Sequence, residues 1–241
     1  MKSGKNLKKG GFTLLETVIA IGVLAVLLTG FMAVFGPAAN SIKRSINAQE
    51  ADRLATSVER ELVTLHKNES TTTIKSGFDK AFTWLDECDD YRTAIFVYQY
   101  RANPDSIRSD ETLQPVKSAK GQPGKDYIVL PMVRRLDDPE FFNDLPAIEG
   151  TLFLVKCTQL TFDEQDRLVA DPNKTNGKIL DPRNDTAVSV PDRYPDSVIA
   201  FAAEFHAMPT TTVAYFKGDG FKRRFETAKN PVFVRNLAVR R

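Results

Sequence analysis

The chain has 241 residues, 42% hydrophobic and 27% charged, which is ordinary for a globular protein and allows one large domain or two small ones. Its formal net charge is +2, but the first eleven residues contain four lysines and no acid, so the rest of the chain holds 29 basic and 31 acidic side chains. Because the two charges are nearly balanced, the overall charge gives no reason to expect a nucleic-acid-binding protein.

The first predicted element is a membrane helix. Residues 17–35 are nineteen consecutive residues without a charge, enough to span roughly 30 Å of hydrocarbon as a helix. A buried core helix would normally keep a polar face, and this stretch has none. The lysines that precede it are typical of the cytoplasmic flank of a membrane helix, so we expect the rest of the chain to be translocated.

Two small residues stand before the apolar run, where an ordinary secretory signal would have its cleavage site after the run. Cleavage after Gly11 would remove the basic leader and keep the helix, with Phe12 as the new amino terminus. Residues four apart lie on one helical face, so the new ammonium and the Glu16 carboxylate could meet, within one chain or between neighbours. We therefore predict that Glu16 aligns subunits during assembly.

The string "GFTLLE", residues 11–16, follows two lysines and precedes the apolar run. It resembles the class III signal of type IV pilins and type II secretion pseudopilins; a plain signal-anchor is the alternative. The resemblance implies cleavage after Gly11 by a prepilin peptidase, N-methylation of Phe12 and an assembly role for Glu16. It also implies that the partners are other pilin or pseudopilin subunits, an inner-membrane assembly platform and membrane lipid.

The helix is expected to continue beyond the bilayer. Apolar residues recur at threes and fours between Ile42 and Leu65 with polar residues between them, and Pro37 should kink the helix without ending it. We therefore expect a protein of the inner membrane that crosses it once, with a cytoplasmic amino terminus and a periplasmic head, or a periplasmic or extracellular filament after assembly. The predicted segments are a removed leader (1–11), a transmembrane and filament-core helix (12–36), its amphipathic continuation (37–67) and a globular head (68–241).

The head is predicted to be rich in strands. A short helix is expected over residues 76–91, and the "GDG" of residues 218–220 is interpreted as a hairpin turn. Most of the strands lack an intervening helix long enough for a crossover, which favours an antiparallel sheet packed on the long helix, an α+β, pilin-like fold. The predicted strands are 94–102, 126–135, 150–163, 196–208, 211–225 and 230–239.

Cys88 and Cys157 are an even number of cysteines in a chain expected outside the cytoplasm, where a disulfide can persist. A bridge between them would close about seventy residues and contribute about 3–4 kcal/mol in the loop-entropy model. Two separate buried thiols are the alternative, and the sequence leaves both open.

The head offers little catalytic or metal-binding chemistry. His66 and His206 have no cysteine or second histidine at ligand spacing, so we expect no zinc site, and the acids of residues 86–90 are interpreted as a solvated helix end. Residues 171–177 fail the EF-hand pattern, so no cofactor is expected, although some pseudopilins bind calcium in loops. Nucleophile elbows, phosphate loops and dinucleotide fingerprints are absent from the sequence, so we predict no enzyme.

The sequence therefore predicts a structural subunit of a type IV pilus or of a type II secretion-like pseudopilus. The bulk of the head favours a minor subunit over an abundant one. One alternative is a DNA-uptake or adhesion pilin that binds its ligand at Lys222, Arg223 and Arg224, although a solvated strand face is the favoured interpretation of that group. The other is a membrane-anchored periplasmic binding protein or enzyme.

Overall fold

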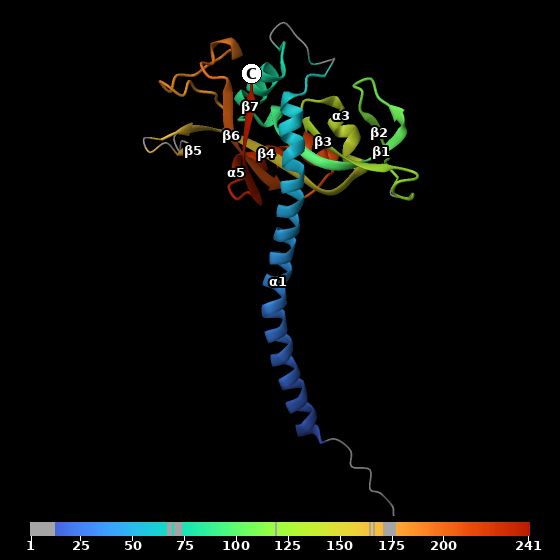
Figure 1. Ribbon diagram of the computed structural model, residues 1–241. Coiled ribbons are helices and arrows are strands. Elements are labelled where there is room, and N and C mark those ends of the chain that lie inside the picture. The colour runs from blue at the N-terminus through green and yellow to red at the C-terminus, as the bar shows by residue number, and fades with distance from the viewer. Residues whose placement is uncertain are drawn as a thin grey trace, which may run out of the picture. The chain divides into compact units, whose positions relative to one another are not determined.

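The computed structural model describes residues 13–66, 69, 74–118, 120–163, 165, 167–170 and 177–241. The chain divides into two units, Met1–Ile46 and Asn47–Arg241. We call the second unit the head. One element, the 50-residue helix α1 (Leu14–Val63), runs from the first unit into the head (Figure 1).

In the first unit, α1 is apolar on all sides between Thr17 and Phe35. Every leucine, isoleucine, valine, phenylalanine and methionine between Leu14 and Phe35 is at least 52% exposed. Pro37 lies inside the helix, which confirms that it does not end the helix. The apolar surface of this unit is therefore unburied along its whole length.

In the head, α1 buries one face. Its buried residues are Ala51, Leu54, Ala55, Val58 and Leu62. Their spacing of three and four places them on one stripe of the helix, which packs on the sheet. The predicted amphipathic stripe was wrong at its start, because Ile42 and Ile46 are both exposed. Ile42 and Ile46 continue the spacing of the buried stripe, but the sheet does not cover them.

All strand pairs of the sheet are antiparallel, and neighbouring strands are not always consecutive in the chain. The residues that the structure describes form seven strands in the order β2-β1-β4-β6-β7, with β3 paired to β1 and β5 to β4 (Figure 1). The strands are β1 (Ile95–Ile107), β2 (Leu113–Pro115), β3 (Ile128–Arg135), β4 (Ile148–Phe162), β5 (Leu168–Ala170), β6 (Val198–Ala207) and β7 (Phe233–Arg240). Together with α1 they confirm the expected α+β, pilin-like fold.

The sheet separates two hydrophobic cores. Alternate residues of β1 serve both, since Ile95 and Val97 lie in the core beneath α1, whereas Phe96, Tyr98 and Tyr100 lie in the core on the other face. The first core also receives the helix α2 (Gly77–Asp86), which was expected within residues 76–91. The remaining helices are α3 (Pro139–Asp144), α4 (Val213–Lys217), α5 (Asp219–Thr227) and the short 3-10 turns η1 (Tyr91–Thr93), η2 (Leu145–Ala147) and η3 (Pro191–Arg193).

The strand predicted over residues 211–225 and its hairpin turn were wrong, because this segment forms α4 and α5. Its threonine, valine and tyrosine residues favour a strand locally. Packing prevails over that preference, since Phe216 and Phe221 lie 5.5 and 5.4 Å from the ring centre of Phe96. A helix places Phe225 one turn beyond Phe221 on the same buried face.

Candidate functional site

The acid singled out by the sequence, Glu16, lies in the first turn of α1. Its backbone N–H donates to Oγ1 and to the carbonyl oxygen of Thr13, at 3.3 and 3.1 Å, so Thr13 caps the helix. The carboxylate is therefore at the positive end of the helix dipole, where a negative charge is stabilised. It has no hydrogen-bond or ion-pair partner among the described residues. Gly11 and Phe12 lie outside the described residues, so cleavage and methylation stay predictions.

The helix that follows Glu16 has the character of a membrane span. An 18-residue window of α1 has a mean hydropathy of 2.7, and none of that window is buried. By length and composition, this helix can cross a bilayer. The acid and the exposed apolar surface thus belong to one continuous element.

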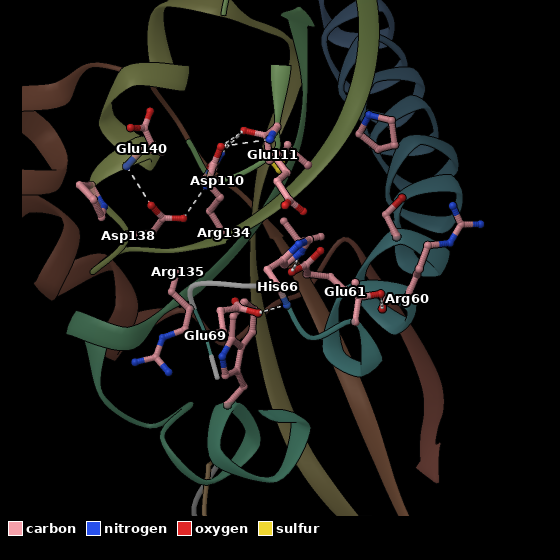
Figure 2. A pocket seen from close by; sticks show the side chains of 18 of the residues that line it. Arg60, Glu61, His66, Glu69, Asp110, Glu111, Arg134, Arg135, Asp138 and Glu140 are labelled. Carbon is pink, nitrogen blue, oxygen red and sulfur yellow. Dashed lines mark hydrogen bonds and ion pairs between the residues drawn. The ribbon is translucent and has the colours of Figure 1, made fainter. Parts of the chain in front are cut away.

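The head contains a pocket of about 790 Å³ between the end of α1, strand β3 and the turn of residues 109–112 (Figure 2). Beside it, the fully buried Lys80 donates from Nζ to Glu61 Oε1, Glu69 Oε2 and the Thr64 carbonyl oxygen, each at 2.7 Å. Glu61, His66 and Glu69 are close enough together to hold a metal ion. The Lys80 ammonium already bridges both carboxylates, so these residues do not fit a metal unless Lys80 is displaced.

On the opposite wall of the pocket, Arg134 belongs to a buried network of charged side chains around Asp144. Asp144 is fully buried and accepts from Tyr98 Oη at 2.7 Å and from Arg134 Nε at 2.9 Å. Arg108 Nη2 lies 2.9 Å from the other oxygen of Asp144. Arg134 also donates to Asp110 at 2.8 Å. Burial alone would raise the pKa of Asp110, but hydrogen bonds from Thr112 and Arg134 outweigh it and lower that pKa to about 2.

These contacts explain what the pocket does in the fold. On one side of the pocket, Lys80 joins α2 to Glu61 of α1. On the other side, Arg134 joins β3 to α3, and Arg108, the residue that follows β1, joins that end of the strand to α3. None of these residues was predicted as a site residue, because their partners are distant in the sequence. The geometry supports a structural role for the charged residues around the pocket.

The comparison that bears on function concerns the amino-terminal end. A family model described as the prokaryotic N-terminal methylation motif matches residues 6–32. The chain carries a type IV pilin-type signal. No curated protein and no solved structure gives a significant match. The pilin-type signal therefore covers the first part of α1 and no residue of the head.

Within the pilin-type signal, the structure places Glu16 where the sequence predicted it, in the opening turn of the long helix. The match begins before the described residues and includes both Gly11 and Phe12. It ends at residue 32, inside the exposed apolar surface of α1. A pilin or pseudopilin-like role for the chain rests on this match.

The basic group predicted on a strand lies on helix α5 instead. Lys222 and Arg223 are exposed, and Arg224 is half-buried. The same helix exposes Asp219 and Glu226, so its surface carries both signs of charge. This mixture gives no support to a site for nucleic acid.

The two histidines lie in different surroundings. His66 follows the end of α1, and its Nε2 lies 3.0 Å from Glu61 Oε1. His206 is in β6, as predicted for its segment, and is buried with its Nε2 3.4 Å from Glu204 Oε2. The suggested calcium loop lies outside the described residues except for Gly177.

The acids of residues 86–90 are used within the protein. Asp86 accepts a hydrogen bond from the backbone N–H of Ile179 at 3.0 Å, and Glu87 lies 2.8 Å from Arg135 Nη1. Asp90 caps the turn η1 through the backbone N–H of Arg92. These acids therefore stabilise the chain at the end of α2.

Proposed function

We propose that this protein is a subunit of a type IV pilus or of a type II secretion-like pseudopilus, assembled through α1. The observation that carries the proposal is that the pilin-type signal at residues 6–32 overlaps the first part of α1, where every large apolar side chain from Leu14 to Phe35 is exposed. Leaving so many large apolar side chains in water would cost on the order of tens of kcal/mol. A bilayer covers them in the monomer, and neighbouring helices cover them in the filament.

Cleavage after Gly11 by a prepilin peptidase supplies the partner of Glu16. It creates an ammonium at Phe12, four residues away, and Phe12 is then methylated. An unpaired carboxylate within the hydrocarbon costs a few kcal/mol. The terminal ammonium of a neighbouring subunit offsets this cost only when the two helices are in register. Glu16 thereby sets the position of each new subunit, which an assembly platform in the inner membrane adds from the lipid.

The proposed organisation follows the sequence segments: a removed leader (1–11), a transmembrane and filament-core helix (12–36), an amphipathic continuation (37–67) and a periplasmic head (68–241). The head is large and carries its own two cores, which supports a minor subunit over an abundant one. A structural role and not an enzymatic one is supported by the ion pairs that engage the half-buried Glu61 and the buried Asp144 beside the pocket.

The first experiment is mass spectrometry of the protein extracted from membranes of cells that contain a prepilin peptidase. The expected product begins at methylated Phe12, and a Gly11→Val variant is expected to keep Met1 because the bulky side chain blocks cleavage. A Gly10→Ala variant, altered one residue away, is the matched control and is expected to be cut. An intact Met1 terminus on the unaltered protein would contradict the proposal.

The second experiment separates processing from assembly. A Glu16→Gln subunit is expected to be cut and methylated, yet to enter sheared filaments at least about tenfold less, since losing a charge pair costs more than about 1.4 kcal/mol. Asp52→Asn, which alters an exposed acid of the same helix, is the control. Normal incorporation of Glu16→Gln would remove the role assigned to that carboxylate.

A further inference from the structure

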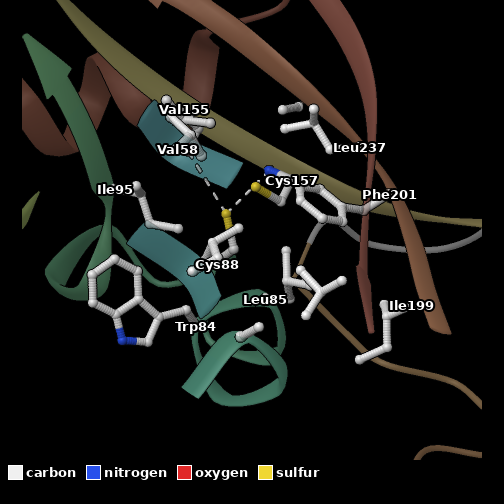
Figure 3. Packing of buried hydrophobic residues seen from close by; sticks show 14 of the residues in the cluster. Val58, Trp84, Leu85, Cys88, Ile95, Val155, Cys157, Ile199, Phe201 and Leu237 are labelled. Atoms are coloured by element: carbon white, nitrogen blue, oxygen red, sulfur yellow. Dashed lines mark hydrogen bonds between the residues drawn. The ribbon is translucent and has the colours of Figure 1, made fainter. Parts of the chain in front are cut away.

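The core beneath α1 contains two cysteines, which we call the cysteine pair. Cys88 lies just after α2, and Cys157 lies in the middle of β4; both are fully buried and are free thiols in the structure. The backbone N–H of Cys157 donates to Cys88 Sγ at 3.1 Å, and the Cys88 thiol donates to the carbonyl oxygen of Val155 at 3.8 Å. Figure 3 shows the two sulfur atoms facing one another within the hydrophobic cluster. The pair is thus already in contact without any change in the fold.

The backbone around the cysteine pair is held in place. Gly177 has a φ of +79°, and a Cβ there would collide with the backbone of Cys88 and Asp89. The backbone N–H of Gly177 donates to the carbonyl oxygen of Cys157 at 3.3 Å. Gly177 therefore lies against the backbone of Cys88 and is hydrogen-bonded to Cys157. The neighbouring side chains of Val58, Leu85 and Phe201 are buried in the same cluster.

We propose that Cys88 and Cys157 are joined by a disulfide in the mature head, introduced by a protein dithiol–disulfide carrier. The inference rests on the proposed function, because an oxidising compartment requires a translocated head. One cysteine thiolate attacks the carrier disulfide and releases one carrier thiolate. The other cysteine, as a thiolate, then attacks the mixed disulfide and releases the second. Two thiols are oxidised, the carrier disulfide is reduced to a dithiol, and the carrier thiolates take up the two protons.

Burial fixes when this reaction takes place. A carrier cannot reach sulfur atoms that are covered by α1, α2 and the backbone at Gly177, so the bond forms before these elements close over the pair. The same burial protects the bond afterwards from reductants in solution. A bridge over the 69-residue separation shifts the folding equilibrium by about 10³-fold towards the folded state in the loop-entropy model.

The test uses the full-length protein extracted in mild detergent at acidic pH, which keeps free thiols protonated and slow to oxidise. After denaturation without reductant, a maleimide–polyethylene glycol reagent is expected to add to neither cysteine, and after reduction it should add to both, with the protein monomeric throughout. Two reactive thiols in unreduced protein whose terminus is Phe12 would overturn the disulfide alone. Two reactive thiols together with a retained Met1 terminus would count against the proposed function as well.

Variants separate a bond from mere packing. Cys88→Ala, Cys157→Ala and the double variant are each expected to lower the denaturant midpoint of the head by a similar amount, because each of them removes the same bond. Reduction of the unaltered protein should lower its denaturant midpoint by most of the same amount. Additive losses in the double variant, or a midpoint unaffected by reductant, would show that the two side chains only fill space and would overturn the inference.

Discussion

The two halves of α1 have the same backbone and opposite surroundings. Leu24, in the first unit, is 63% exposed, whereas Leu54, in the head, is 1% exposed. The first half is apolar on every side, and the second half places Asp52 and Arg53 outward and its leucines inward. One helix thus carries two interfaces, of which the chain itself completes only the second.

The head covers its own apolar surface and pairs its buried charges, so its free energy of unfolding should depend on contacts within the chain. The first half of α1 has no such contacts among the described residues, so its substitutions should act on insertion and assembly instead.

The largest effect is expected at Asp144. Replacing it by alanine leaves Arg108 and Arg134 with buried guanidinium groups that have lost their shared carboxylate. The free energy of unfolding of the head, measured by denaturant titration of the full-length protein in mild detergent, should fall by about 3–5 kcal/mol. Asp137→Ala removes a half-exposed carboxylate nearby and should cost less than about 1 kcal/mol. Equal losses for the two variants would contradict a buried network.

The matched leucines test the comparison directly. Leu54→Ala should lower the free energy of unfolding of the head by about 2–4 kcal/mol, because it leaves a cavity in the core beneath α1. Leu24→Ala should change it by less than about 0.5 kcal/mol, since that side chain touches no part of the head's core. Its effect should appear in the amount of subunit recovered in filaments. A large loss of head stability for Leu24→Ala would show that the two halves are not independent.

A smaller effect is expected from pH. The folded-state pKa of Asp110 is about 2, below its ordinary value of 3.8, so its ionised form stabilises the fold above about pH 4. That contribution is lost as the pH falls from about 4 to about 2. Asp110→Asn should therefore flatten the acid limb of the unfolding free energy by about 1 kcal/mol, after allowance for solvent screening. Stability curves that stay parallel through this range would disprove the contribution.

The sequence predicted the long helix and the antiparallel sheet because both depend on local pattern. A charge-free run and a recurrence of apolar residues at threes and fours are visible in the sequence itself. The segments around β1, β3, β4, β6 and β7 were predicted for the same reason. The order of those strands could not be predicted, since pairing depends on contacts between distant segments.

The missed features depend on tertiary contacts. Helix α5 was predicted as part of a strand because its burial against Phe96 is not encoded by its own residues. Lys80 has the sequence signature of a surface residue, and only the approach of Glu61 and Glu69 explains why it is buried. The cysteines were recognised from their number, but their contact across α2 and β4 required the fold.

The position of β7 in the sheet places a condition on the order of events in the cell. This strand is the last in chain order, pairs with β6 from Phe233 to Arg240, and contributes Leu237 and Val239 to the core beneath α1. Under the proposed topology, the polypeptide emerges on the far side of the membrane with its amino-terminal anchor already in place. The head cannot finish folding until β7 has emerged, so a translocating chain stays open, and accessible to folding catalysts and proteases, until that strand has crossed the membrane.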